Sequence, residues 1–424
     1  MRKLARGASP GLSGWTAELA GIIAQDDVGA RFLASVATDI ANNAVGPTAR
    51  ERITATELHG LAKPDGGIRP VALGEVILKM TANILLAQHE DVVRGHFAGL
   101  QFGVLSRGGA ADVPWLVRQE LARNPAAAVA TIDARNAFNT PARAAIAARL
   151  ADPRFAFLRG LFDLEYGAPS LLFVAGAGDG AFMLSSSGTR QGSVAAGLFF
   201  CLALHPVLLA LRDACPHVRI FAYMDDVTLV GEPRKVEEAA RKLEAGLATI
   251  HIALNRGKCE WWEASGAVRA GFARPKAAPG IKVLGAVIGL SAADTSSWLE
   301  SHARAHHEDF WRRLRSLPPE CLVPLLSVCG VPQMAYLLRT HDADATASPA
   351  AAFEERVRTL IDFALDTRLT DDERALAHLP ARLGGLGLTD VTRIARIASE
   401  AARASACSPA AAPGSQRLLT EALN

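Results

Sequence analysis

Three aspartates have the residue types and the spacing most suited to chemistry in this sequence. Asp133 directly follows a short apolar run, and Asp225 and Asp226 lie side by side between two β-branched segments. Carboxylate oxygens at a strand end and in a tight turn are hard ligands, which select Mg²⁺ over Zn²⁺. Two such ions about 3.5–4 Å apart can activate an attacking hydroxyl and stabilise a leaving pyrophosphate in an in-line displacement. A lone Asp-Asp pair is usually a solvated turn, but apolar strands flank this one and Tyr223 precedes it.

Short apolar runs around these aspartates predict the strands that position them. Residues 127–132 predict a buried strand that ends at Asp133, and 217–221 with 227–230 predict a hairpin around the aspartate pair. Residues 281–288 predict one more strand. The glycine-rich sequence 64–67 predicts a turn, so 61–70 should form a second hairpin with Lys63 and Arg69 on either side of its tip.

The remaining periodic segments predict helices, so the fold class is α+β, a sheet backed by helices. From residue 297 onward the pattern is all helical. The Ala/Ser/Pro-rich stretch 343–352 predicts a loop between helices, and 408–415 predicts a frayed tail. The segments with apolar residues at helical spacing are 76–93, 111–121, 236–250, 298–314, 322–338 and 353–365.

Composition excludes several classes of protein. The 424 residues carry a net charge of only +2, so any contact with nucleic acid must use locally placed basic groups. Six scattered cysteines without a Cys-x-x-Cys pair fit neither a zinc knuckle nor a secreted disulfide scaffold. No signal peptide is visible, and the apolar stretch 194–211 fits a buried core helix better than a membrane span. We therefore expect a soluble, intracellular protein, without choosing between nucleus and cytoplasm.

The aspartate hairpin resembles a known family. Residues 221–226, Phe-Ala-Tyr-Met-Asp-Asp, resemble the Tyr-x-Asp-Asp hairpin of reverse transcriptases, and 131–139 resemble the first metal-binding motif in its non-LTR retrotransposon (LINE-like) form. Further motifs follow in the family's order. They are Arg190-Gln191-Gly192-Ser193 (nucleotide-binding Gln-Gly motif), 254–258 (lysine near the pyrophosphate), Val283-Leu284-Gly285 (primer-grip hairpin), and 379–388 (the segment after the thumb).

This resemblance implies an RNA-directed DNA polymerase, a nucleotidyltransferase that extends a primer 3′-hydroxyl. It implies two Mg²⁺ ions, with Mn²⁺ as an alternative, and as partners an RNA template, a DNA or RNA primer and deoxynucleotide triphosphates, without a membrane. The implied metal ligands are Asp133, Asp225 and Asp226. The implied catalytic residues are these three with Lys258, and the implied nucleotide-binding residues are Lys63, Arg69, Phe138, Gln191, Gly192 and Tyr223.

Each of these residues also has a plainer explanation. An aromatic ring at Phe138 would crowd a ribose 2′-hydroxyl, or it packs in the core. Gln191-Gly192 at a helix start suits a closely approaching nucleotide, or it is a capping turn. Lys63 and Arg69 suit a mobile phosphate clamp, or they are solvated charges. Lys258 could protonate pyrophosphate, or it merely follows a glycine turn.

The resemblance further implies a right-hand polymerase with fingers, a palm whose antiparallel sheet is backed by helices, and a helical thumb. The expected domains are a tail (1–30), fingers and palm (31–290), thumb (291–370) and a C-terminal extension (371–424). One rival is an RNA-dependent RNA polymerase, which more usually has Gly before the aspartate pair. The other is a catalytically silent nucleic-acid-binding scaffold, which the three intact aspartates argue against.

Two clusters on the expected thumb remain to be weighed. His302, His306 and His307 with Glu308 have helical spacing that could bind a metal, but a solvated helix face explains them better because no further ligand cluster supports a site. The second cluster, Arg304, Arg312, Arg313 and Arg315 with Trp311, suits either a duplex backbone or an ordinary surface helix.

Overall fold

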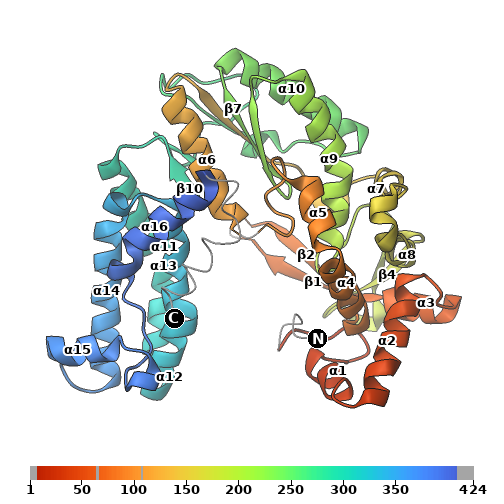
Figure 1. The fold of residues 1–424 in the computed structure, drawn as a ribbon, viewed down its shortest axis with the longest axis horizontal. Helices are drawn as coiled ribbons and strands as arrows, with labels where there is room; N and C mark the ends of the chain where they lie inside the picture. Colours follow the sequence, from red (N-terminus) through yellow and green to blue (C-terminus); the bar gives the residue numbers. More distant parts are fainter. Residues whose placement is uncertain (1–6, 64–65, 107, 408–424) are drawn as a thin grey trace. The chain divides into compact units, whose positions relative to one another are not determined.

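The computed structural model describes residues 7–63, 66–106 and 108–407. The chain divides into two compact units (Figure 1). Unit 1 comprises Met1–Ser106, Ile132–Leu229 and Arg234–Cys259, and unit 2 comprises Arg107–Thr131, Val230–Pro233 and Glu260–Asn424. All ten site residues implied by the sequence fall within unit 1, so the candidate site can be described inside a single unit.

A four-stranded sheet in unit 1 contains the predicted 61–70 hairpin. Its strand order is β2-β1-β4-β5, with β1 (Thr56–Ala62) antiparallel to β2 (Ile68–Leu73) and parallel to β4 (Ser170–Val174). Strand β5 (Phe182–Ser185) pairs antiparallel with β4. The hairpin is therefore confirmed, although Pro64 and Asp65 of the predicted turn lie outside the described residues.

The second four-stranded sheet contains the strands that bear the aspartates. Its order is β6-β7-β3-β8, with bounds Arg219–Tyr223, Asp226–Gly231, Ala128–Ile132 and Glu260–Trp262. The apolar residues of β3, β6 and β7 are almost all buried, which is why short β-branched runs form strands here. Both the buried strand before Asp133 and the hairpin around the aspartate pair are confirmed.

The helices of unit 1 follow the predicted periodicity with one exception. The segment 76–93 is not one helix, because the backbone leaves helical geometry at His89 (φ −122°, ψ 23°) and divides it into α4 and α5. The most buried helix is α9, which carries an almost continuous apolar sequence through the unit. The bounds are α1 Ala17–Ile23, α2 Asp27–Ala41, α3 Pro47–Thr54, α4 Val76–Gln88, α5 Glu90–Phe97, α7 Arg143–Arg149, α8 Ala156–Tyr166, α9 Ala196–Ala214 and α10 Pro233–Thr249.

Unit 2 is mainly helical, and two predictions made for it are wrong. The expected loop 343–352 is the first half of α14, because Ala345, Thr346, Pro349 and Ala350 are buried against the helical core and this packing outweighs the interior proline. The apolar pattern predicted a single strand over 281–288, but the structure has a hairpin of β9 (Ile281–Val283) and β10 (Ala286–Ile288), as the resemblance of Val283-Leu284-Gly285 to a hairpin implied. The helices are α6 Gly109–Arg123, α11 Ala292–Arg315, α12 Pro319–Leu325, α13 Val331–Thr340, α14 Ala343–Ala364, α15 Asp371–Ala377 and α16 Val391–Cys407. The expected tail 408–415 lies outside the described residues.

Two helical stretches are long and apolar enough, by length and composition alone, to cross a membrane. The first is α9, whose side chains are mostly buried, and core helices pass the same test. The second, Pro319–Thr340, is about one-third buried and is interrupted by a π-helical turn at Leu326–Gly330 between α12 and α13. Length and composition are therefore weak grounds for assigning either stretch to a membrane.

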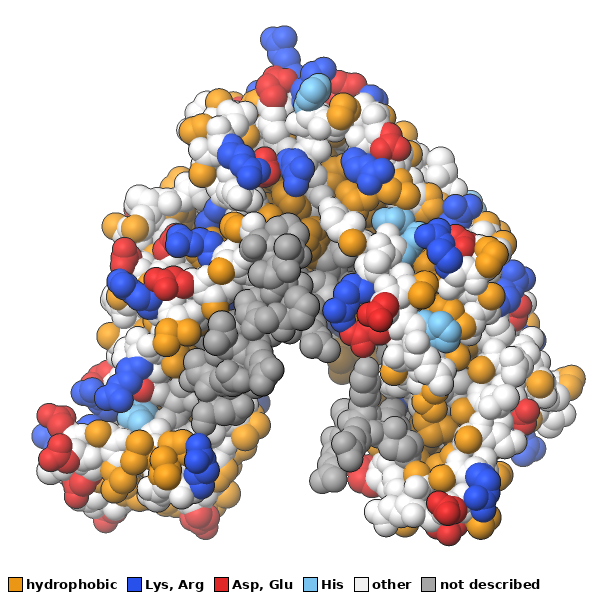
Figure 2. Space-filling view, viewed as in Figure 1, with side chains coloured by type: hydrophobic (Ala, Val, Ile, Leu, Met, Phe, Trp, Pro, Cys, Tyr) orange, Lys and Arg blue, Asp and Glu red, His pale blue; other side chains and the backbone are white. Residues whose placement is uncertain are grey.

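Charged side chains are intermixed over the face of the molecule in Figure 2. Lys and Arg lie among Asp and Glu, with apolar side chains between them. This distribution agrees with the net charge of +2. A contact with nucleic acid on this face would therefore depend on a few placed groups.

Candidate active site

The aspartate pair lies at the tip of the β6–β7 hairpin. Met224 and Asp225 form its two-residue turn, and Asp226 is the first residue of β7. Met224 has a φ of +54°. For a residue with a side chain this left-handed conformation costs about 1–2 kcal/mol, so it persists only where surrounding contacts hold it.

The side chain of Gln101 supplies those contacts. Its Oε1 accepts a hydrogen bond from Met224 N at 2.7 Å, and its Nε2 donates to Met224 O at 3.0 Å. The neighbouring backbone pairs with β6, since Leu100 O accepts from Ala222 N and Phe102 N donates to Ala222 O. Gln101 is only 5% exposed. Sequence reasoning missed it, because a glutamine outside the motifs carries no local sign of a partner 123 residues away.

Gln101→Met should lower the rate of primer extension about tenfold. Methionine keeps the size of the side chain but leaves both polar backbone groups of Met224 without their partner, a cost of about 1–3 kcal/mol. Steady-state kinetics should show the loss in kcat, with the KM for primer nearly unchanged. Gln25→Met is the control, because Gln25 is exposed. Equal kcat values for the two variants would contradict this positioning role.

Asp133 follows β3 directly, and its backbone is held on both sides. Its carbonyl accepts from Asn255 N at 2.8 Å, and its N–H faces the Cys259 Sγ at 3.4 Å. One residue further on, Ala134 pairs antiparallel with Leu254. The segment that the sequence analysis associated with pyrophosphate therefore pairs with the end of the strand that bears the first aspartate.

The three carboxylates and two basic side chains form one electrostatic cluster. Burial raises the pKa of Asp225 and the charge of Asp133 raises it further, whereas Arg69 and Lys63 lower it. Burial and the charges of Asp225 and Asp133 raise the pKa of Asp226 to about 6, although this residue keeps substantial exposed surface. The structure thus brings together five residues from three separate parts of the sequence.

This donor set fits a hard divalent cation in its chemistry. All three groups offer carboxylate oxygens, and a cation between them would relieve the repulsion that raises two of their pKa values. Within the described ranges, no three His, Cys, Asp or Glu side chains are close enough together to hold an ion as they stand. The three-carboxylate metal site therefore stays a prediction.

Lys63 and Arg69 flank the tip of the β1–β2 hairpin, as the sequence analysis placed them. Leu61 pairs with Arg69, and Lys63 N donates to Gly67 O at 2.7 Å. Arg69 is exposed and Lys63 is half-buried. Both lie near enough to Asp225 to lower its pKa, so they belong to the electrostatic environment of the aspartates.

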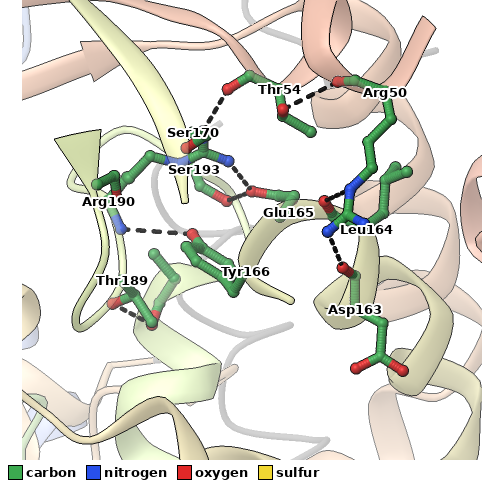
Figure 3. A network of polar contacts seen from close by, with 12 residues as sticks. Arg50, Thr54, Asp163, Leu164, Glu165, Tyr166, Ser170, Thr189, Arg190 and Ser193 are labelled. Carbon is green, nitrogen blue, oxygen red and sulfur yellow. Dashed lines mark hydrogen bonds and ion pairs between the residues drawn. The ribbon is translucent and has the colours of Figure 1, made fainter. Parts of the chain in front are cut away.

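A buried ion pair supports the Gln191-Gly192 turn (Figure 3). Arg190 Nη2 donates to Glu165 Oε2 at 2.9 Å, and both side chains are less than 5% exposed. Ser193 Oγ donates to the same carboxylate oxygen at 3.0 Å. The guanidinium also donates to Thr54 O and to Ser170 Oγ. The residues on both sides of Gln191-Gly192 are thereby fixed.

Gly192 also meets a structural need that the sequence did not indicate. Its φ is +112°, and a Cβ there would overlap the Ala72 carbonyl oxygen of β2, while Ala72 N donates to Gln191 O at 2.7 Å. The missing side chain therefore makes room for a strand of the same unit. The expected helix start is also displaced, since α9 begins at Ala196.

Glu165→Gln should destabilise unit 1 by about 3–5 kcal/mol, because it leaves the Arg190 charge buried without its partner. Asp309→Asn is the control. It breaks an ion pair with Arg312 whose side chains are both about 70% exposed, and should cost less than about 1 kcal/mol. Denaturant unfolding of both variants measures the difference. Equal losses would show that the buried pair contributes no more than a surface pair.

Phe138, Tyr223 and Lys258 are the remaining predicted site residues. Phe138 is half-buried in a 3₁₀ turn (Ala137–Asn139), with its ring 4.9 Å from that of Phe200. Tyr223 is half-buried at the end of β6. The side chain of Lys258 is exposed, and its N–H donates to the carbonyl of Asn255, the residue whose N–H binds Asp133. These placements leave the roles of all three residues as predictions.

One thumb cluster differs from its sequence interpretation. Trp311 is 5% exposed and packs edge-on against Phe353 in the helical core, so it is unavailable to a duplex backbone. Arg312 pairs with Asp309 on the surface. His302 stacks on Trp298 along α11 and His306 lies against His302 with its ring tilted, and no metal cluster involves them within the described part of the chain.

Comparisons with known proteins give a family match and a similar relative. The sequence matches the family model described as reverse transcriptase (RNA-dependent DNA polymerase) over residues 61–288, a range that contains every predicted site residue. It is 28% identical over 414 residues to the retrotransposable element SLACS 132 kDa protein of Trypanosoma brucei gambiense, covering 95% of this chain and 34% of that protein. The chain thus spans about a third of the length of this relative.

Solved telomerase structures share a distant likeness. Apo telomerase from Candida tropicalis is similar with a TM-score of 0.42 and 10% identity, over 89% of this chain and 70% of the other. The form truncated from the C-terminal domain gives a TM-score of 0.37 and 11% identity, over 50% of each chain.

Proposed function

Because the matched model covers residues 61–288 of 424, the chain belongs to the reverse transcriptase (RNA-dependent DNA polymerase) family, and we propose that it extends a primer 3′-hydroxyl with deoxynucleotides on an RNA template. The observation that carries this proposal is the cluster of Asp133, Asp225 and Asp226 with Lys63 and Arg69 in unit 1. Three carboxylates beside two basic groups suit a reaction on a charged triphosphate. Because the chain spans about a third of the SLACS relative, an activity or partner of that whole protein is attributed to this chain only as part of this proposal.

Asp133, Asp225 and Asp226 would hold the divalent metal, with two Mg²⁺ ions as the proposed complement and Mn²⁺ as an alternative. When bound, the ions would lower the pKa of the attacking hydroxyl and neutralise charge on the leaving pyrophosphate. Gln101 keeps the turn that carries Asp225 in its left-handed conformation. The chain itself would thus contribute the oxygen ligands, one of them on a turn that Gln101 holds.

The basic residues would bind the triphosphate and donate a proton to the leaving pyrophosphate. Arg69 can contact two phosphate oxygens at once with its planar guanidinium, and Lys63 adds a point charge beside it. Lys258 would donate a proton to the leaving pyrophosphate, since its segment pairs with the Asp133 backbone. Gln191 and Tyr223 would contact the nucleotide next to these groups.

Primer extension on a defined RNA template tests the proposal. Purified protein with Mg²⁺ should add deoxynucleotides in template order and should use ribonucleotides poorly. Equal use of both would favour an RNA-dependent RNA polymerase. Binding of primer–template without any extension, with either Mg²⁺ or Mn²⁺, would favour a silent scaffold.

A further inference from the structure

The hairpin of β9 and β10 has a strained turn. Val283 pairs with Ala286, so Leu284 and Gly285 form a two-residue turn, and their φ values are +48° and +93°. Positive φ at both central positions is the conformation of hairpin turns that match strand twist. Leucine is poorly suited to it, so contacts from elsewhere must hold the turn.

Tyr336 of α13 supplies a contact at each of the two turn residues. Its hydroxyl donates to the carbonyl of Leu284. Its ring lies against Gly285, where an added Cβ would come within 3.3 Å of Cε1. The hydroxyl also lies 3.3 Å from Ala110 O of α6. The tyrosine therefore joins the turn to two helices of unit 2.

Side chains from α6 and from the residue after α13 bind the backbone of strand β10. Val287 N donates to His341 Nε2 at 3.1 Å, and Val287 O accepts from Arg118 Nη2 at 2.9 Å. Burial and the Arg118 charge lower the pKa of His341 to about 3, so the ring is neutral at physiological pH and its Nε2 can accept. His341 Nδ1 donates to Leu337 O of α13, which fixes the tautomer. Both polar backbone groups of Val287 thus have side-chain partners.

We infer that Tyr336 is a positioning residue that holds the Leu284–Gly285 turn as a rigid seat for the primer strand. The inference rests on the proposed function and on the resemblance of Val283-Leu284-Gly285 to the primer-grip hairpin of reverse transcriptases. Because Tyr336 lies on α13, its hydroxyl connects the hairpin to the helices of unit 2. A change confined to the tyrosine hydroxyl should therefore alter how primer binds and leave nucleotide use alone.

Tyr336→Phe tests this inference. The variant keeps the ring against Gly285 and removes the hydroxyl, with its hydrogen bonds to Leu284 O and Ala110 O. We expect the dissociation constant for primer–template to rise about five- to tenfold, as measured by fluorescence anisotropy without nucleotide. In extension assays the KM for primer–template should rise with it, and the KM for deoxynucleotide should stay within about twofold.

Thr340→Val is the matched control on the same helix. Thr340 is fully buried, and its hydroxyl donates to Tyr336 O at 2.8 Å and lies 3.1 Å from His341 Nδ1, so the substitution removes buried polar contacts beside both anchors of the hairpin and keeps the Tyr336 hydroxyl on the turn. It should lower the melting temperature at least as much as Tyr336→Phe and leave primer binding unchanged. A similar rise in the dissociation constant in both variants would overturn the inference, because general destabilisation would then explain it.

A substitute variant and one further outcome complete the test. If Tyr336→Phe does not fold, Gly285→Ala replaces it, since a Cβ at φ +93° against the same ring disturbs the same turn. Unchanged primer affinity in a folded variant overturns the inference.

Because the test measures binding without nucleotide, its result is independent of whether the proposed polymerase activity is correct. A wild-type protein that binds primer–template but never extends it would refute polymerase activity while leaving the role of Tyr336 to the affinity comparison.

Discussion

Asp225→Asn is expected to reduce primer extension at least about a thousandfold without unfolding the chain. The carboxylate would be one ligand of the catalytic metal, and losing several kcal/mol of charge stabilisation in the transition state corresponds to this factor. Asp133→Asn should have the same effect, and Asp226→Asn should also cripple extension. Single-turnover extension with Mg²⁺ measures the loss.

The stability of the Asp225→Asn variant should not fall together with its activity. Burial and neighbouring like charges raise the pKa of Asp225 and Asp226, so their ionised forms are held in the native state at a cost in free energy. A neutral asparagine removes that cost, and the denaturation midpoint should stay level or rise at neutral pH. Asp213→Asn, at an exposed residue near the end of α9, is the control and should leave extension intact. Full extension by Asp225→Asn would refute the proposed mechanism.

Phe138→Val is expected to weaken the preference for deoxynucleotides by a factor of about ten to a hundred. If the ring lies under the sugar, shrinking it opens space for a 2′-hydroxyl. Steric exclusion of about 1.4–2.8 kcal/mol corresponds to that factor. Single-turnover incorporation of a matched deoxy- and ribonucleotide measures the ratio directly.

Packing in the core predicts a different result for the same substitution. The ring of Phe138 contacts that of Phe200, so its loss should cost stability whichever role is correct. Phe155→Leu is the control, because Phe155 is 1% exposed and lies in another part of the core of unit 1. It should lower the melting temperature with sugar selectivity unchanged. The same unchanged selectivity in Phe138→Val would return that residue to core packing.

Local sequence pattern was enough to predict the family and the parts of the site. The ordered motifs from Lys63 to Lys258 indicated a reverse transcriptase of the retrotransposon type, and the family match and the SLACS relative confirm that kinship. Short apolar runs ending in Asp133 and flanking the Asp225–Asp226 pair indicated the strands correctly. Such signals survive in the sequence because a strand, a tight turn and a metal-binding carboxylate each depend on residues next to one another.

Tertiary contacts decided the features that the pattern got wrong. The buried residues of α14 keep 343–352 helical despite its proline, and the apolar pattern missed the turn at Leu284, which only the motif resemblance indicated, because leucine is not a turn residue. At Gly192, the approach of β2 requires a glycine for a reason that the pattern did not reveal. Each outcome depends on a partner brought close only by folding, which local propensity does not report.

The residue types of the site were therefore determined by the sequence itself, and their support by the fold. Three aspartates could be named from their spacing, and two basic groups and an aromatic ring from the resemblance to reverse transcriptases. Gln101 under Met224, Glu165 under Arg190 and Tyr336 under Leu284 could not, since these pairs are 123, 25 and 52 residues apart. A motif records which groups do chemistry, because they act through their own atoms. The groups that hold a motif in place act through backbone hydrogen bonds and buried charge, which many residue types at many positions can supply, and only the packed structure selects among them.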